Sequence, residues 1–109
     1  MKGITTKELK KLIDSGKDFV LLDCRSCDSY EKEHIKGAIC IRWNEVGEKA
    51  ANVLPNKDTL IVTSCSGVTC DASTKCYANL EKLGYTNVRE YAGGLFEWKA
   101  HGYKTEGRK

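Results

Sequence analysis

The sequence predicts an α/β fold, and three observations carry this prediction. Short apolar runs alternate along the chain with stretches of helical periodicity. The run at residues 19–22 is continuously apolar, which is typical of a strand that is covered on both faces of its sheet. Glycines such as Gly16 and Gly84 stand where helical patterns end. We therefore expect a mainly parallel sheet with helices packed against it.

The individual elements follow from local patterns. Thr5 is placed to cap a first helix, with Glu8 answering three residues later and Gly16 ending it. Leu9, Leu12 and Ile13 share one face of that helix, which predicts the face that is buried. Strands are predicted at 19–22, 38–41, 60–63 and 88–91, and further helices from about residue 28 and at 44–51, 73–83 and 94–101.

Length, composition and charge exclude several classes of protein. A chain of 109 residues with 40% apolar residues predicts a single domain over residues 1–109. The apolar runs are far shorter than the ~20 residues of a membrane-spanning helix, and the first residues lead into a polar stretch, so we expect neither a span nor an export signal. The net charge of +3 is spread among alternating acidic and basic residues, so neither nucleic acid nor a membrane is an expected partner.

Six cysteines are many for a chain of this length, and they fit a disulfide scaffold, a metal site or thiol chemistry. Long periodic elements and the lack of an export signal favour free thiols and a cytoplasmic location. Cys40 lies in a predicted strand and Cys76 in a predicted helix, so both are interpreted as core residues. The others, Cys24, Cys27, Cys65 and Cys70, lie in predicted strand-to-helix loops.

The loop that begins at Cys65 is the candidate site. In a parallel sheet, ligands bind beyond the carboxyl ends of the strands, and Cys65 follows the strand at 60–63 directly. A helix starts near residue 71 or 72, and its first amides and dipole favour a thiolate and an anion bound to it. We expect the anion cradle to consist of backbone amides of the loop, which are those of Ser66, Gly67, Val68, Thr69, Cys70 and Asp71.

The remaining loop cysteines leave alternatives open. Cys70 is either a resolving thiol for Cys65 or a small residue packed beneath the loop. Cys24 and Cys27 form a C-x-x-C pair, which suggests redox work or part of a zinc or iron–sulfur site together with Cys65 and Cys70. The other interpretation is that Cys24 only fills the position between Asp23 and Arg25.

Several motifs in order resemble those of the rhodanese family of sulfurtransferases, from about residue 4 to residue 105. They are Asp23-Cys24-Arg25, the Y-x-x-x-H-I-x-G-A pattern that starts at Tyr30, the strand that ends at Cys65, and Gly93-Gly94 with Trp98. The resemblance implies a five-stranded, mainly parallel sheet with helices on both faces. It also implies that Cys65 accepts sulfane sulfur as a persulfide and hands it to a nucleophile. We expect no cofactor and no metal. Asp23 and Arg25 are interpreted as a pair that stabilises the loop, and the other interpretation is that Arg25 helps to bind an anion.

The departures from the family pattern concern the active loop. Residues 66–72 contain no Arg or Lys, and Asp71 adds a negative charge, so thiosulfate is expected to be a poor donor. The expected partners are a small sulfur-containing donor and a thiol or cyanide-type acceptor, or a protein that exchanges persulfide. A non-catalytic persulfide relay and a cysteine-rich redox or metal-binding module stand as the alternatives to an enzyme.

Overall fold

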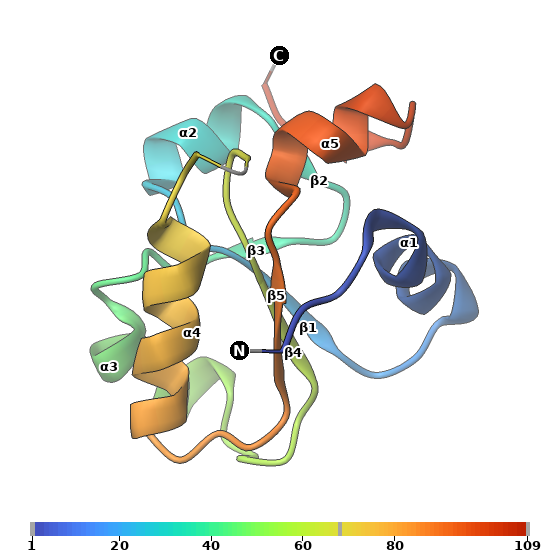
Figure 1. The fold of residues 1–109 in the computed structure, drawn as a ribbon. Helices are drawn as coiled ribbons and strands as arrows, with labels where there is room; N and C mark the ends of the chain where they lie inside the picture. The colour runs from blue at the N-terminus through green and yellow to red at the C-terminus, as the bar shows by residue number, and fades with distance from the viewer. Residues whose placement is uncertain (1, 68, 109) are drawn as a thin grey trace.

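A four-stranded parallel sheet forms the centre of the molecule (Figure 1). The computed structural model describes residues 2–67 and 69–108. Strands β1 (Val20–Asp23), β3 (Ile39–Cys40), β4 (Ile61–Ser64) and β5 (Val88–Tyr91) lie side by side in the order β3-β1-β4-β5. This arrangement confirms the predicted α/β class with a mainly parallel sheet.

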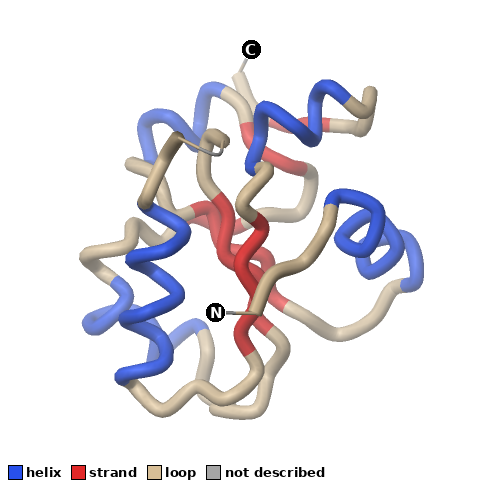
Figure 2. Tube along the Cα trace, in the orientation of Figure 1, coloured by secondary structure: helices blue, strands red, loops and turns tan. Residues whose placement is uncertain are grey.

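Helices cover both faces of this sheet (Figure 2). Helices α3 (Val46–Val53) and α4 (Ala72–Lys82) pack on one face, and α1 (Thr6–Ser15) and α5 (Gly94–Ala100) pack on the other. A short helix, α2 (Cys27–Lys32), lies at the carboxyl end of the sheet. None of the described helices is long and apolar enough to cross a lipid bilayer.

The expected strand count of five is corrected to four among the described residues. The segment before α1 lies along β5, where the Ile4 amide donates to the Glu90 carbonyl at 3.0 Å, but it forms only one isolated bridge. A separate antiparallel pair joins β2 (His34–Ile35) to β6 (Thr105–Glu106). Two-residue strands are too short to show a period in the sequence, which is why this pair was not predicted.

Local signals explain the elements that the sequence did predict. Thr5 caps α1 in a capping box with Glu8, and Gly16 ends the helix in the left-handed conformation with a φ of 69°. Every residue of β4 is buried, as expected for a central strand with helices on both sides.

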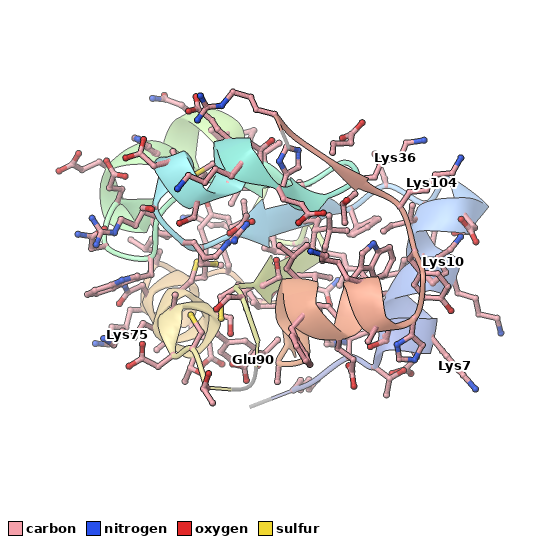
Figure 3. The ribbon with its side chains drawn as sticks, turned by 90° about the horizontal axis from the view of Figure 1, so that it is seen from above. Lys7, Lys10, Lys36, Lys75, Glu90 and Lys104 are labelled. Atoms are coloured by element: carbon pink, nitrogen blue, oxygen red, sulfur yellow. A yellow bond between two sulfur atoms is a disulfide. The ribbon has the colours of Figure 1, made fainter. Side chains whose placement is uncertain are left out.

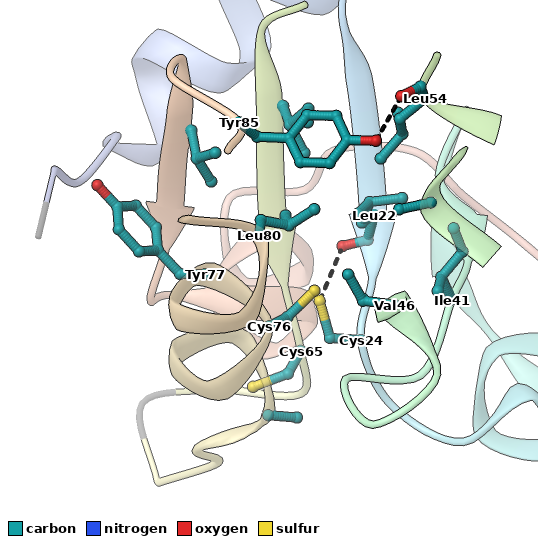
Figure 4. Packing of buried hydrophobic residues seen from close by; sticks show 14 residues of the cluster. Leu22, Cys24, Ile41, Val46, Leu54, Cys65, Cys76, Tyr77, Leu80 and Tyr85 are labelled. Atoms are coloured by element: carbon teal, nitrogen blue, oxygen red, sulfur yellow. Dashed lines mark hydrogen bonds between the residues drawn. The ribbon is translucent and has the colours of Figure 1, made fainter. Parts of the chain in front are cut away.

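The register of the sheet determines which loops meet. Asp23 of β1 stands beside Ser64 of β4 on one side and beside Cys40 of β3 on the other. The chain segments that follow these three residues therefore leave the sheet at the same edge. All six cysteines lie at or near this edge or in the core beneath it, where Cys24, Cys65 and Cys76 belong to one buried cluster (Figure 4).

Candidate functional site: the cysteine loop at the carboxyl end of the sheet

Cys65 is held at the carboxyl end of β4, immediately before the loop that leads into α4. The preceding residue is tied to β1 twice, because the Ser64 hydroxyl donates to the Leu22 carbonyl at 3.0 Å and the Cys24 amide donates to the Ser64 carbonyl at 2.9 Å. Cys65 itself is only 2% exposed. Its backbone therefore stands on a rigid strand.

The Cys65 thiol is hydrogen-bonded within its own loop. Its Sγ lies 3.4 Å from the Cys70 carbonyl oxygen and 3.6 Å from the Gly67 carbonyl oxygen, to which the S–H donates. Burial raises the pKa of the Cys65 thiol, and a hydrogen bond with the Cys70 side chain adds to this rise. Hydrogen bonds from the backbone amides of Ser73 and Gly67 act in the opposite direction and favour the thiolate. The site thus holds Cys65 as a protected thiol while offering amides to its charged form.

Cys70 lies in the same loop, but its pKa shifts in the opposite direction. Burial raises the pKa of its thiol, but the hydrogen bond from Cys65 and those from the amides of Ala72 and Ser66 outweigh burial, so the pKa is lowered. The Ser66 hydroxyl contributes a further hydrogen bond to the Cys70 sulfur. Cys70 is also less buried than Cys65. It is therefore the more acidic and the more accessible thiol of the pair.

The amides around the two sulfurs only partly coincide with the expected cradle. Those of Ser66 and Gly67 act on a sulfur, as do those of Ala72 and Ser73 in the first turn of α4, beyond the expected range. The Cys70 amide instead donates to the Gly67 carbonyl at 3.0 Å and so closes the loop on itself. Val68, another residue of the expected cradle, lies outside the described residues.

Helix α5 supports the loop from the other side, a contact that was not predicted. The Leu95 amide donates to the Cys65 carbonyl at 2.9 Å, and the Phe96 amide donates to the Ser66 carbonyl at 2.8 Å. Gly94 begins α5 with a φ of +63°, and a Cβ at this position would lie 2.5 Å from the Cys65 carbonyl oxygen. The Gly-Gly pair before α5 was the signal in the sequence, since only glycine permits this approach.

Cys27 and Cys40 form a disulfide, which corrects three expectations. Their Cα atoms are 5.8 Å apart, and the bond joins the start of α2 to the end of β3. Cys40 is therefore not a core residue, since it lies half-buried on the edge strand β3. Cys27 pairs with Cys40 rather than with Cys24, so the C-x-x-C motif is not a redox pair. The expectation of six free thiols is wrong for these two.

Cys24 instead faces the core with Cys76. The side chains of Cys24 and Cys76 approach each other behind Cys65 (Figure 4), and both residues are fully buried, as predicted for Cys76. Burial, followed by the hydrogen bond with Cys76, raises the pKa of Cys24 well above its usual value. The four-thiolate arrangement considered for zinc or an iron–sulfur cluster is not formed, because the Cys27 sulfur is bonded to Cys40. No group of three or more metal-ligating side chains occurs within residues 2–67 and 69–108.

Asp23 and Arg25 form a nearly buried ion pair beside the loop. The Arg25 guanidinium donates through Nε to Asp23 Oδ1 at 2.9 Å and through Nη2 to Asp23 Oδ2 at 2.7 Å. A third bond runs from Nη2 to the Glu33 carbonyl at 2.7 Å. Only 5% of the Asp23 side chain and 13% of the Arg25 side chain are exposed.

A hollow of about 450 Å³ lies next to the loop, between it and α5. Its lining is mainly apolar with one lysine at its side, and consists of Ser66, Leu95, Phe96, Lys99 and Ala100. Phe96 is the most exposed large apolar side chain of the described part of the chain, at 77%. The loop therefore borders a recess that is large enough for a small molecule or for part of a partner protein.

Comparison with known proteins adds to this geometry. The family model described as "Rhodanese-like domain" matches residues 5–101. The mouse thiosulfate sulfurtransferase/rhodanese-like domain-containing protein 3 is 37% identical over 110 residues, which cover 89% of this chain and 68% of the relative. A putative sulfur carrier protein, YrkF of Bacillus subtilis, is 30% identical over 87% of this chain, which spans about half (49%) of that relative. The crystal structure of the BH2092 protein from Bacillus halodurans superposes with a TM-score of 0.90 at 30% identity, over 97% of this chain and 77% of that one.

Proposed function

Because the chain belongs to the rhodanese-like domain family, we propose that it is a sulfurtransferase in which Cys65 carries sulfane sulfur as a persulfide. The observation that supports this most directly is the position of Cys65 at the end of a buried strand, with the amides of Gly67 and Ser73 bonded to its sulfur. A sulfur carrier of this kind needs a soft nucleophile on a rigid support, with donors that stabilise negative charge on sulfur. Cys65 meets each of these needs.

The proposed reaction has two half-reactions. In the first, the Cys65 thiolate attacks the outer sulfur of thiosulfate or of another sulfane-sulfur donor. The S–S bond of thiosulfate breaks, and sulfite leaves with the bonding electron pair. In the second, a thiolate or cyanide attacks the terminal sulfur of the persulfide, and Cys65 leaves as a thiolate. Both are displacements at sulfur, so neither needs a base to activate water.

Cys70 is proposed as a resolving thiol. Its thiolate attacks Sγ of the Cys65 persulfide, a Cys65–Cys70 disulfide forms, and hydrosulfide leaves with the electron pair of the broken S–S bond. Two equivalents of an external thiol then reduce the disulfide. The hydrogen bond between the two side chains and the lowered pKa of Cys70 support this role.

A persulfide relay to a protein partner is the second candidate. The relative that is named a putative sulfur carrier favours it, as does the exposed Phe96 beside the loop, where a partner would touch the protein. The acceptor in this case is a protein thiol and not a small molecule. The cytoplasmic location stays a proposal, and the Cys27–Cys40 bond counts against it because disulfides are rare in reducing compartments.

Intact mass spectrometry tests the carrier role. Incubation with thiosulfate or mercaptopyruvate should add one sulfur atom to Cys70→Ser, in which the persulfide is not resolved, and none to Cys65→Ser, in which the proposed sulfur carrier is missing. Turnover to thiocyanate with cyanide supports the enzyme, whereas loading without turnover supports the relay. The Cys27→Ser/Cys40→Ser variant is the matched control, because it also loses cysteines but keeps Cys65 and should still load. If Cys70→Ser gains no sulfur from any donor, the proposal is wrong.

A further inference from the structure

The active loop itself carries no cation for an anionic sulfur donor. Residues 66–72 contain no Lys or Arg, and Asp71 adds a negative charge. The labelled lysines Lys7, Lys10, Lys36 and Lys104 gather on the α1 side of the molecule, and Lys75 projects on the α4 side (Figure 3). Lys99 of α5 lines the hollow beside the loop, but its charge is paired with Glu33 at 2.8 Å. We therefore look for a further positive group at the edge of the sheet.

The register of the sheet brings Arg25 to that edge. Asp23 of β1 is paired with Ser64 of β4, so Arg25 leaves β1 level with the point where the Cys65 loop leaves β4. The bond from the Cys24 amide to the Ser64 carbonyl continues the pairing to the residue before Arg25. Neighbouring parallel strands lie roughly 4.8 Å apart, which places the Arg25 backbone beside the start of the active loop.

Hydrogen bonds fix the Arg25 side chain but do not use all of its donors. Nε and Nη2 are occupied by the Asp23 carboxylate and the Glu33 carbonyl. Nη1, in contrast, has no hydrogen-bond partner among residues 2–67 and 69–108, although the side chain is largely buried. Cys40 Sγ, an atom of the Cys27–Cys40 disulfide, lies 3.8 Å from the Arg25 carbonyl oxygen, so the disulfide packs against the main chain at Arg25. One edge of a rigid guanidinium thus remains free to donate.

The guanidinium of Arg25 also interacts electrostatically with the sulfurs of Cys65 and Cys70. Burial lowers the pKa of Arg25, the hydrogen bonds and charge of Asp23 raise it, and negative charge on Cys65 and Cys70 raises it further. Together with the pairing of β1 and β4, this electrostatic contact supports an action of Arg25 on an anion bonded to one of the sulfurs.

We propose that Arg25 binds the anionic end of the sulfur donor through Nη1 while Cys65 attacks the outer sulfur. This inference rests on the proposed function at Cys65 and specifies its substrate class as sulfane-sulfur donors with a sulfonate, sulfinate or carboxylate group. Asp23 holds the guanidinium in place and, through its own negative charge, weakens the attraction for the anion. Arginine suits this role because its planar donors match the oxygens of such groups.

Two variants of the Asp23–Arg25 ion pair, for which we expect opposite effects on the KM, give the sharpest test. The Asp23→Asn/Arg25→Gln double variant leaves no unpaired buried charge, and we expect its KM for thiosulfate to rise about tenfold, the loss of one charge-assisted hydrogen bond, with a smaller change in kcat. Asp23→Asn alone exposes the donor to the full positive charge and should lower the KM. If the ion pair only supports the loop, both variants impair kcat and neither lowers the KM. Arg108→Gln, at a surface arginine paired with Glu31, is the control and should change nothing.

Alkylation in place of turnover separates this inference from the proposed function. In Cys70→Ser, we would measure the rates at which anionic iodoacetate and neutral iodoacetamide modify Cys65. The ratio of the two rates should fall severalfold when Asp23→Asn/Arg25→Gln is added, because the variant loses the group that favours the anion. This holds even if Cys65 never carries sulfur. An unchanged ratio in folded protein, verified by circular dichroism, would overturn the inference.

Discussion

At the scale of single residues, the thiols of Cys65 and Cys70 differ in burial and in the direction of their pKa shifts. Cys65 is buried and hydrogen-bonded to loop carbonyls, and its pKa is raised. Cys70 is more accessible, and its pKa is lowered. Loading of Cys65 with sulfur removes the S–H that Cys70 receives as a hydrogen bond. The Cys70 sulfur still keeps the amides of Ala72 and Ser66. Cys70 is thus placed to act after Cys65 has been loaded.

The release of sulfide from loaded protein should therefore follow the ionisation of Cys70. With no acceptor present, wild-type protein that carries one persulfide should release hydrosulfide and lose two thiols, while Cys70→Ser should keep its persulfide. The amides of Ala72 and Ser66, which remain after loading, lower the pKa of Cys70 and favour its thiolate, so the release rate should rise with pH as this thiol ionises. A sulfide electrode measures this rate, and Cys27→Ser/Cys40→Ser is expected to behave as the wild type. Equal release from Cys70→Ser would exclude the resolving role.

The residues of the candidate site could be predicted from the sequence only where the signal is local. The end of β4 at Cys65 and the start of α4 follow from an apolar run and a helical period, and the Asp23-Cys24-Arg25 motif marked the ion pair. The partner of Cys27 could not be predicted, because it depends on β3 lying beside β1, which is a matter of strand order and not of spacing. The free edge of Arg25 also depends on the side-chain geometry that only the fold reveals.

At the scale of elements, the geometry of the loop depends on α5 as much as on α4. The first turn of α5 is bonded to the Cys65 and Ser66 carbonyls, and Gly94 allows the close approach. A displacement of this helix would move the amides and carbonyls that surround both sulfurs. The contact between loop and helix is thus a condition for a rigid nucleophile.

Gly94→Ala tests this dependence. The new Cβ would lie 2.5 Å from the Cys65 carbonyl oxygen and 2.7 Å from the Gly67 nitrogen, both backbone atoms that cannot rotate away. We expect a loss of at least about 2 kcal/mol in the free energy of unfolding, since a left-handed conformation alone costs roughly 1–2 kcal/mol, and at least a tenfold slower persulfide formation. Gly84→Ala is the control, because its φ is +95° but a Cβ there meets nothing within 4 Å. It should lower the stability, as measured by urea unfolding, but leave persulfide formation intact. Similar kinetics for the two variants would contradict the proposed role of α5.

At the scale of the whole molecule, apolar clusters stabilise the two faces of the sheet, whereas a disulfide links the short elements at its carboxyl edge. Each face has an apolar cluster under its helices, and the larger one contains three of the cysteines, Cys24, Cys65 and Cys76. The edge has short elements, namely the six-residue α2 and the two-residue β3, which bury few side chains. The Cys27–Cys40 disulfide joins these two elements. We therefore expect this covalent bond to supply stability that buried apolar surface supplies elsewhere in the molecule.

Reduction of this disulfide should therefore weaken the molecule at its functional edge. The bond links residues 13 positions apart, for which the loss of chain entropy in the unfolded state corresponds to about 3 kcal/mol. Cys27→Ser/Cys40→Ser should lower the free energy of unfolding by that amount, which is measured by urea unfolding, and a reducing agent should lower that of the wild type equally. The reducing agent should have no effect on the double variant, because its other four cysteines are free thiols. Since the disulfide also packs against the backbone at Arg25, Cys27→Ser/Cys40→Ser, assayed without a reducing agent, should raise the KM for thiosulfate and leave persulfide formation at saturating donor intact. A wild-type protein whose stability does not respond to reductant would show that the disulfide contributes nothing to the fold.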